Sequence, residues 1–151
     1  MRIHRFYIEN FTGSENSELH IEDEALLHQW RDIFRMKGGD ELAIFNATEG
    51  EWLAQVVSID KKAGARLRLI NRLRTAADAV PKTEMALYVA IIKNSNFDLV
   101  VEKATELGVS HIIPITTERT IKTNLNFERL NKLITEATEQ SRRLDRPDVS
   151  E

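Results

Sequence analysis

The chain has 151 residues, enough for one large domain or two small ones. Its formal net charge is -3, so any binding to nucleic acid would depend on local basic patches. It has no cysteine, which excludes disulfides, cysteine zinc sites and thiol nucleophiles and fits a cytoplasmic location. We expect neither a transmembrane helix nor a secretory signal, because its apolar runs are too short.

The first half of the chain alternates short apolar segments with turn residues, at the spacing of a β-protein. Two of its turns end in Gly50 and Gly64, as hairpin turns often do. We predict strands at Arg5–Glu9, Glu18–Ile21, Glu41–Asn46, Trp52–Ile59 and Ala65–Leu73. Together with one helix, they predict a small closed or half-closed barrel over residues 1–74.

The helix interrupts these strands. Apolar residues at helical spacing should form one face that packs on the sheet, and the pair Gly38-Gly39 is expected to end the helix. The residues of that face are Leu26, Trp30, Ile33 and Phe34.

Residues 75–82 are small and polar, contain a proline and predict a linker to a second domain, residues 83–151. That domain begins with Met85–Ile92, a continuous apolar run typical of a strand buried on both faces.

A helix and a further strand follow. Apolar residues recur at helical spacing from Phe97 to Leu107, and Gly108 is well placed just after the helix end. His111–Ile115 is the next apolar strand, so the segment predicts a βαβ unit with two parallel strands. The side chains able to cap the start of the helix are Asn94, Ser95 and Asn96.

A second helix is predicted from Phe127 to about Arg143, with Pro147 as its stop and Asp145–Glu151 as a polar tail. Two parallel strands are few for a sheet of this type, which needs cover on both faces. We therefore expect either a partner that completes the sheet or a longer protein of which this chain is the front portion, and favour the second.

A basic segment without acidic residues occupies positions 61–74. Its members are Lys61, Lys62, Arg66, Arg68, Arg72 and Arg74. The four arginines share one parity, so a regular strand would place them on one face. This is typical of a stripe that follows RNA phosphates, and also of an outward strand face kept soluble and guarded against edge pairing. Charge alone favours the second interpretation.

Other basic residues lie near helix ends. Arg31 and Arg35 are four residues apart and would share one side of a helix. Their spacing fits an RNA-binding face and a solvent-exposed face equally well. Arg119 follows a parallel strand, where ligands tend to bind. Arg142 and Arg143 end the last helix, where they suit the helix dipole.

Motifs for other chemistry are missing from the sequence. Its six glycines form neither a dinucleotide-binding loop nor a Walker A loop. Its four histidines lack zinc-motif spacing, so no metal is expected, and there is no GxSxG nucleophile elbow.

Several motifs, in chain order, resemble those of one known family. They are Arg5-Phe6-Tyr7, Ile33-Phe34-Arg35 with Gly39-Asp40, Lys93, Phe97–Val109 (FDLVVEKATELGV), Ile113-Pro114, Thr117-Glu118-Arg119, Glu136–Arg142 (EATEQSR) and Pro147. Across nearly its whole length the chain resembles the bacterial ribosomal RNA small-subunit methyltransferase E family, which makes N3-methyluridine in 16S rRNA. It departs from the family at Asn94, usually glycine, and at Phe34, usually leucine.

The resemblance implies a fold, a cofactor and partners. The fold is α+β followed by α/β: a PUA-like RNA-binding barrel, then the first half of a SPOUT domain whose C-terminal trefoil knot is absent. The family uses S-adenosylmethionine and acts on the small ribosomal subunit as a homodimer, with no membrane and no metal. Its Gly-Pro-Glu-Gly-Gly cofactor loop has no match here, so cofactor-binding residues are expected beyond Glu151 and the chain alone should be inactive.

The implied reaction is methylation of uridine N3, which must lose its proton to become a good nucleophile and must be unpaired to be reached. Arg119 and Arg142 are the candidates for the substrate side of the active site. The candidate RNA-binding residues are Arg5, Arg31, Arg35, Arg66, Arg68 and Lys93. Two other functions stay open: a non-catalytic RNA-binding module, and an interaction protein that uses an exposed sheet edge.

Overall fold

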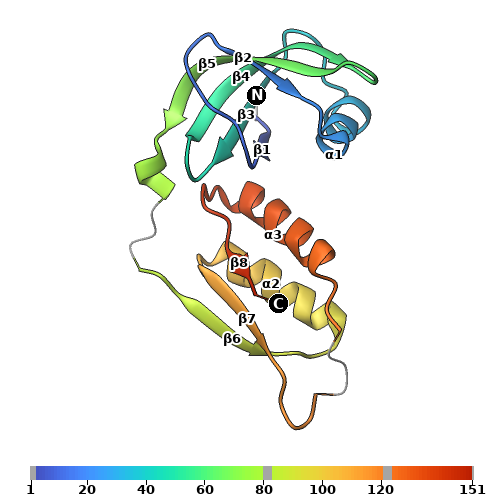
Figure 1. Ribbon diagram of the computed structural model, residues 1–151, viewed down its shortest axis with the longest axis vertical. Coiled ribbons are helices and arrows are strands. Elements are labelled where there is room, and N and C mark those ends of the chain that lie inside the picture. Colours follow the sequence, from blue (N-terminus) through green and yellow to red (C-terminus); the bar gives the residue numbers. More distant parts are fainter. Residues whose placement is uncertain (1–2, 80–82, 121–123, 151) are drawn as a thin grey trace. The chain divides into compact units, whose positions relative to one another are not determined.

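The computed structural model describes residues 3–79, 83–120 and 124–150. The chain divides into two compact units, unit 1 (Met1–Ala77) and unit 2 (Asp78–Glu151), each with its own buried core (Figure 1). The division falls inside the predicted linker, part of which is a short 3-10 helix, η2 (Ala76–Ala79), while residues 80–82 of that linker lie outside the described part.

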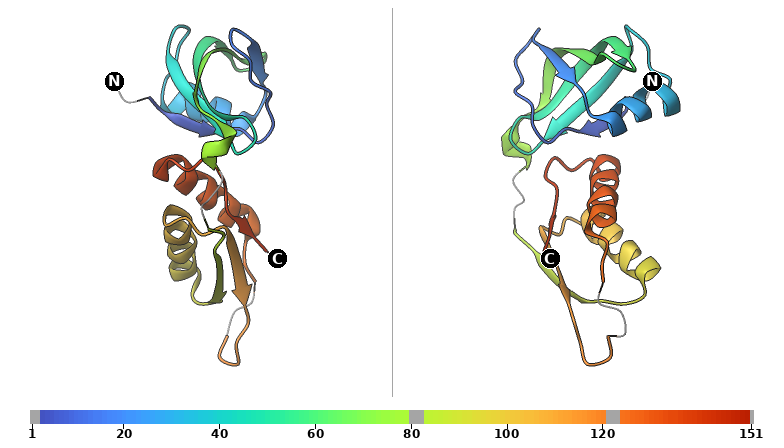
Figure 2. Two further views of the ribbon diagram at one scale, coloured as in Figure 1. Left: turned by 90° about the vertical axis from the view of Figure 1, so that its left-hand side faces the viewer. Right: turned by 45° about the vertical axis from the view of Figure 1, so that its right-hand side comes forward.

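Unit 1 is built on one five-stranded sheet in the order β1-β3-β4-β5-β2. β1 runs parallel to β3, and the other neighbouring pairs are antiparallel. The sheet curves around the core (Figure 2), and among the described residues no pairing joins the edge strands β1 and β2. All five predicted strands are confirmed, with shifts of one to two residues at several ends. They are β1 (Arg5–Tyr7), β2 (Glu18–Ile21), β3 (Glu41–Asn46), β4 (Gly50–Asp60) and β5 (Gly64–Arg74).

Two tight turns connect the antiparallel strands β3, β4 and β5. Gly50 has φ +78°, and a Cβ there would lie 2.2 Å from a backbone oxygen of β5. Gly64 has φ +76°, and before it the Asp60 carboxylate accepts hydrogen bonds from the backbone N–H groups of Lys62 (2.7 Å) and Ala63 (2.9 Å). Glycine takes this left-handed backbone at no steric cost, so both predicted turns are confirmed.

The helical segment of unit 1 is shorter than predicted. α1 (Glu24–His28) begins after Asp23, whose carboxylate accepts two N–H groups of the first turn at 2.9 and 3.0 Å. It continues as a π-helix, η1 (Gln29–Ile33). The segment therefore ends well before Gly38-Gly39, the predicted end.

The π-helical turn changes which side chains face the core. The Phe34 N–H donates to the carbonyl of Gln29, five residues back instead of four, so the turn is wider and the following side chains rotate. Trp30 and Leu27 are buried, whereas Ile33 is 62% exposed. The predicted apolar face is therefore wrong at Ile33.

Unit 2 contains a parallel sheet in the order β6-β7-β8. β6 (Ala86–Ala90) and β7 (His111–Ile115) are joined by α2 (Asn94–Glu106), which confirms the predicted βαβ unit. After α3 (Phe127–Ser141), β8 (Asp148–Val149) lies in the segment predicted as a polar tail, which corrects that prediction. Two residues are too few to show a strand period.

The predicted C-terminal end of α2 is confirmed, whereas its predicted N-terminal cap is wrong. At its C-terminus, Gly108 has φ +94°, and the N–H groups of Gly108 and Val109 bond carbonyls of the last turn at 3.2 and 3.0 Å. This is a Schellman motif and confirms the predicted role of Gly108. At its N-terminus, Lys93 occupies the cap position without a side-chain hydrogen bond, so the predicted polar cap is wrong.

α2 and α3 lie on the same side of the sheet in unit 2 (Figure 2). Ile112 points to that side and belongs to the buried cluster, and Leu87 packs against this cluster. On the other side, which no described helix covers, Tyr88 is 66% exposed. The run Met85–Ile92, predicted to be buried on both faces, is therefore buried on one, because successive strand residues point to opposite faces.

Candidate nucleic-acid interface

The outward face of β5 carries two of the predicted RNA-binding residues. Arg66 and Arg68 are exposed, while the residues between and beside them are buried, as a half-buried strand requires. Arg66 Nε donates to Ser58 Oγ at 3.2 Å, and Arg68 Nη2 lies 3.2 Å from a Glu18 carboxylate oxygen. An exposed ion pair of this kind is weak, so both guanidinium groups are available to a phosphate.

The other two arginines of the predicted stripe, Arg72 and Arg74, are engaged by other side chains. Two register shifts in the pairing of β4 with β5 separate the partner of Arg68 from the partner of Arg74. Each such bulge adds a residue and reverses the alternation of the side chains that follow. The first therefore turns Arg72 to the side of Trp52, and the second returns Arg74 to the face of Arg68. Arg72 lies 4.7 Å over the Trp52 ring, and Arg74 Nε donates to Glu51 at 2.6 Å. The prediction of four arginines on one face is therefore wrong at Arg72.

Arg5 is held inside unit 1. Its Nε donates to the carboxylate of Glu51, which is buried and also accepts from Arg74. The guanidinium lies 4.2 Å over the Phe45 ring, and the side chain is only 11% exposed. Breaking a buried pair of this kind leaves an uncompensated charge. These contacts indicate a structural role for Arg5, and its contact with RNA stays a prediction.

Arg31 and Arg35 do not share one helix side, because the helix ends between them. Arg31 donates to both carboxylate oxygens of Asp32, at 2.8 and 2.6 Å. These bonds, with a further one from His28, hold the pKa of Asp32 below its usual range. Arg35 is exposed in a left-handed conformation, φ 54°, and has no ion-pair partner among the described residues.

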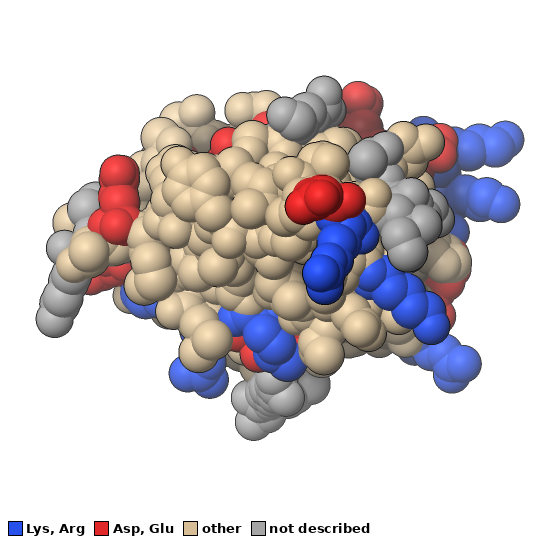
Figure 3. All heavy atoms as spheres, turned by 90° about the horizontal axis from the view of Figure 1, so that it is seen from below, with Lys and Arg blue, Asp and Glu red and all other residues tan. Residues whose placement is uncertain are grey.

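Lys93 and Arg119 both follow the carboxyl ends of strands in unit 2, one after β6 and the other after β7. Both are exposed. Arg119 lies in a turn closed by two hydrogen bonds between Thr117 and Thr120, at 2.8 and 2.9 Å. The surface seen from below in Figure 3 is mostly uncharged, with both basic and acidic side chains scattered over it. Both candidates therefore lie at the edge of the sheet formed by the carboxyl ends of β6 and β7. Parallel sheets usually bind their ligands at this edge.

Arg142 lies at the other edge of the sheet. It follows α3 in a left-handed conformation, φ 62°, and is exposed. Its neighbour Arg143 bonds the carbonyl of Val109, just before β7 begins, whereas Arg119 follows the end of β7. β7 alone spans about 13 Å. The structure therefore does not bring Arg119 and Arg142 together within one copy of the chain.

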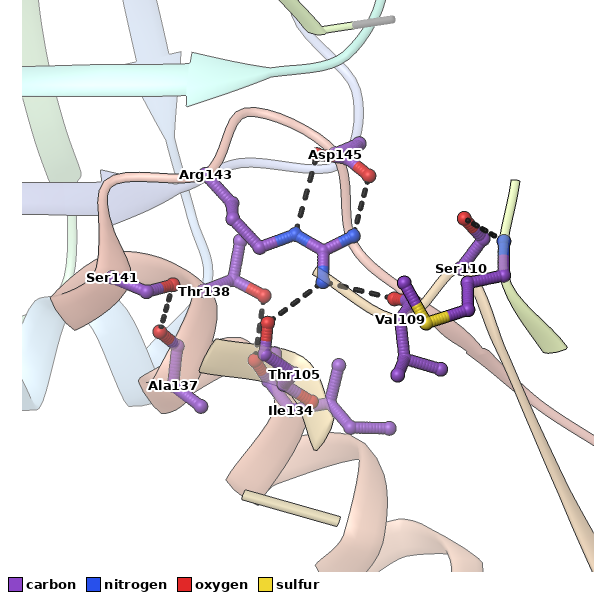
Figure 4. A network of polar contacts seen from close by, with 10 residues as sticks. Thr105, Val109, Ser110, Ile134, Ala137, Thr138, Ser141, Arg143 and Asp145 are labelled. Carbon is purple, nitrogen blue, oxygen red and sulfur yellow. Dashed lines mark hydrogen bonds and ion pairs between the residues drawn. The ribbon is translucent and has the colours of Figure 1, made fainter. Parts of the chain in front are cut away.

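Arg143, predicted from its position only to suit the dipole of its own helix, is firmly bound within unit 2. Figure 4 shows Nη1 donating to the carbonyls of Thr105 (2.7 Å) and Val109 (2.9 Å), while Nη2 pairs with Asp145 at 2.5 Å. It thus ties the end of α2 to the segment that leads into β8. The arginine run predicted a contact with the helix's own dipole, whereas the acceptors belong to α2, which only the packed structure identifies.

Other kinds of site find no support in the part of the chain that the structure describes. No group of three or more His, Asp or Glu side chains there could hold a metal ion. No described helix is both long and apolar enough to cross a membrane. The one glycine of unit 2, Gly108, lies at the edge where Arg142 is, with open space around it, so the described residues of unit 2 do not form a glycine-rich cofactor cradle.

Comparison with known proteins gives a consistent family. Residues 79–151 match the model of the RNA methyltransferase domain family. The ribosomal RNA small subunit methyltransferase E of Rickettsia conorii is 38% identical over 147 residues, which are 97% of this chain and 58% of that protein. The enzyme of the same name from a Synechocystis strain is 31% identical over 128 residues, 83% of this chain and 41% of that protein.

Solved structures share the fold. A methyltransferase from Legionella pneumophila, in complex with the bound cofactor SAM, has a TM-score of 0.83 at 23% identity and covers 99% of this chain and 62% of its own. The ribosomal RNA small subunit methyltransferase E from Neisseria gonorrhoeae, bound to S-adenosyl methionine, has a TM-score of 0.82 at 21% identity, with the same two coverages. The predicted cofactor is thus confirmed for these relatives.

This chain spans 58% of the Rickettsia relative and 41% of the Synechocystis relative. The matched region nevertheless includes both units, and it contains the motifs quoted from the sequence. The chain therefore belongs to the ribosomal RNA small subunit methyltransferase E family, as its motifs predict.

Proposed function

We propose that this chain takes part in the S-adenosylmethionine-dependent methylation of uridine N3 in the 16S rRNA of the small ribosomal subunit. The observation that carries the proposal is 38% identity, over 97% of the chain, to a ribosomal RNA small subunit methyltransferase E. Unit 1 would bind the RNA, as a PUA-like domain, and unit 2 would be part of a SPOUT methyltransferase domain. The reaction would take place in the cytoplasm.

RNA binding would rest first on the outward face of β5. Arg66 and Arg68 alternate with buried residues, so they project from a fixed strand. Glu18, the acid that pairs with Arg68, is itself exposed. Phosphate contacts from such a face orient an RNA strand without reading its sequence.

The uridine would be bound at the carboxyl edge of β6 and β7. Its N3 becomes a good nucleophile once the proton has left, and a nearby cation favours the anion. Arg119 is exposed at this edge, and its guanidinium supplies a positive charge there. Lys93 would bind an adjoining phosphate.

Arg142 would reach the same uridine only from a second copy of the chain, because it lies at the opposite edge of its own sheet. This geometry supports a homodimer in which each active site takes Arg119 from one copy and Arg142 from its partner.

S-adenosylmethionine would supply the methyl group as a sulfonium. The described residues of unit 2 do not fit its adenosine and methionine parts, because the single glycine of this unit lies at the edge away from Lys93. We therefore expect calorimetric titration of this chain alone to detect no micromolar binding of S-adenosylmethionine. Micromolar binding would show that the cofactor site lies within these residues.

The RNA-binding part is tested by salt-dependent titration of a single-stranded 16S rRNA fragment. The double variant Arg66→Ala, Arg68→Ala should lower affinity and flatten the logarithmic salt slope by roughly 0.7 for each lost contact. The matched control, Lys103→Ala with Lys132→Ala, removes two exposed charges from α2 and α3 and should change neither. An unchanged salt slope in this variant would show that Arg66 and Arg68 face solvent and do not contact RNA phosphates.

Methyl transfer separates the two main functions. RNA binding together with methylation of 16S rRNA, in an enzyme that carries both units, supports the proposal. RNA binding without any transfer by that enzyme would favour a non-catalytic RNA-binding module instead.

A further inference from the structure

Unit 1 contains a row of aromatic rings that leads from its core to its surface. Trp30, in η1, is fully buried and meets Phe6 of β1 edge-on, with centroids 5.5 Å apart. Phe6 meets Phe34 at 5.6 Å, and Phe34 lies 4.2 Å from the ring of His4. His4 is exposed. One side of the imidazole therefore rests on the half-buried Phe34 ring, while His4 as a whole remains exposed.

The surface end of this row is held firmly. The His4 carbonyl accepts the N–H of Ala43 in β3 at 2.8 Å, which fixes the backbone of His4 beside β1. The π-turn bond from the Phe34 N–H to Gln29, at 2.9 Å, fixes Phe34 in the same way. A rigid aromatic platform loses little entropy when it binds a flat ligand.

The backbone after Phe34 is strained. Arg35 has φ 54°, a left-handed conformation that is unfavourable for a residue other than glycine, and the next N–H, of Met36, donates to the Trp30 carbonyl at 2.8 Å. Strained backbone and π-helical turns both concentrate at functional sites. The strain leaves Arg35 exposed directly beside the aromatic pair.

Free positive charge adjoins the platform. Neither Arg35 nor Lys37 has an ion-pair partner among residues 3–79, 83–120 and 124–150, and both are exposed. The nearby acids are already engaged: Asp32 pairs with Arg31, and Asp40 accepts the backbone N–H of Lys37 at 2.8 Å.

We propose that His4, Phe34, Arg35 and Lys37 form a binding site for one unpaired nucleotide of single-stranded RNA. The base stacks on the open side of His4, and Arg35 and Lys37 bind the adjoining phosphates. This site rests on the proposed function, in which unit 1 binds RNA, and adds base stacking to the phosphate contacts of β5. Aromatic stacking accepts any base, so the site selects single-stranded over paired RNA, whose bases are already stacked.

The test uses a short single-stranded RNA that carries the fluorescent base 2-aminopurine. His4→Ala should weaken binding about tenfold and abolish the quenching of the base, whereas His4→Phe, which keeps a stacking ring, should stay close to the original affinity and quench as before. On an RNA of the same length with abasic positions, His4→Ala should have no effect. Arg35→Ala should weaken binding to both RNAs.

The outcomes are separable. Equal affinity and equal quenching for the original chain and His4→Ala, with RNA binding still weakened in the Arg66→Ala, Arg68→Ala variant, would overturn the stacking site and leave the proposed function intact. No RNA binding by the original chain would overturn both. Should His4→Ala fail to fold, a fully folded His4→Phe that no longer quenches would equally overturn the site.

Discussion

Two neighbouring arginines at the end of α3 have opposite surroundings. Arg142 is exposed in a left-handed backbone conformation, and Arg143 is 10% exposed and bound to two carbonyls and a carboxylate. Sequence position alone would treat the two as equivalent, yet one is free to contact RNA and the other holds unit 2 together.

Arg143→Ala should lower the free energy of unfolding of unit 2 by about 2–4 kcal/mol, because it leaves buried acceptors without a donor. Both tryptophans lie in unit 1, so the loss should be followed by hydrogen exchange of α2 and α3. Arg142→Gly is the matched control and should stabilise the unit by about 1 kcal/mol, since glycine takes φ 62° without strain. Equal effects of both changes would contradict the assignment.

Asp60 gives a pH-dependent prediction. The backbone N–H groups of Ala63 and Lys62 lower the pKa of Asp60 below 3.8. A carboxyl whose pKa falls on folding stabilises the fold above its unfolded pKa, and this contribution disappears as the pH falls through the lower, folded value. Asp60→Asn should therefore lower the melting temperature of unit 1 at neutral pH but not at a pH well below 3.8. If Asp60→Asn still lowers the melting temperature at that acidic pH, the effect does not come from the negative charge of Asp60.

At the scale of helices and strands, the sequence predicted the segments with a regular apolar pattern, but not the bulges that interrupt that pattern. β3 and β7 have the predicted bounds, because their apolar runs end at turn residues. In β5 the alternation that exposes Arg66 and Arg68 holds, and it fails where bulges shift the pairing with β4. A bulge depends on the partner strand, and so it leaves little trace in the residues of its own strand.

The π-helix is testable by comparing two apolar side chains. Leu27→Ala should cost about 2–5 kcal/mol of the free energy of unfolding, because Leu27 is buried in the core of unit 1. Ile33→Ala should stay within about 0.5 kcal/mol, because this side chain is exposed. Denaturation followed by tryptophan fluorescence measures both. A loss of stability for Ile33→Ala as large as that for Leu27→Ala would instead indicate a regular α-helix that buries Ile33.

At the scale of the whole molecule, the uncovered face of the sheet in unit 2 matters most. Parallel sheets are normally covered on both sides, and here the described helices cover one. The isolated chain should therefore self-associate through that face. Tyr88→Lys with Ile115→Lys, both on the open side, should shift sedimentation toward the monomer.

Leu107→Lys is the control for this experiment, because Leu107 is 80% exposed but follows α2, away from the sheet face. It should leave self-association unchanged. A chain that stays monomeric at high concentration without any substitution would show that the open face attracts no partner.

Local patterns in the sequence were enough to predict the two-part organisation, seven of the eight strands in the described residues, the βαβ unit and the family. These depend on local apolar periods, on turn glycines such as Gly64, and on motifs that are contiguous in the chain. The tertiary structure alone decided which charges are free. Arg5 and Arg143 are bound by partners 46 and 34 to 38 residues away, while Arg35 and Arg66 remain exposed. The separation of Arg119 from Arg142 has the same cause: the distance between two residues is set by the packing of α3 against the sheet, which no local pattern encodes.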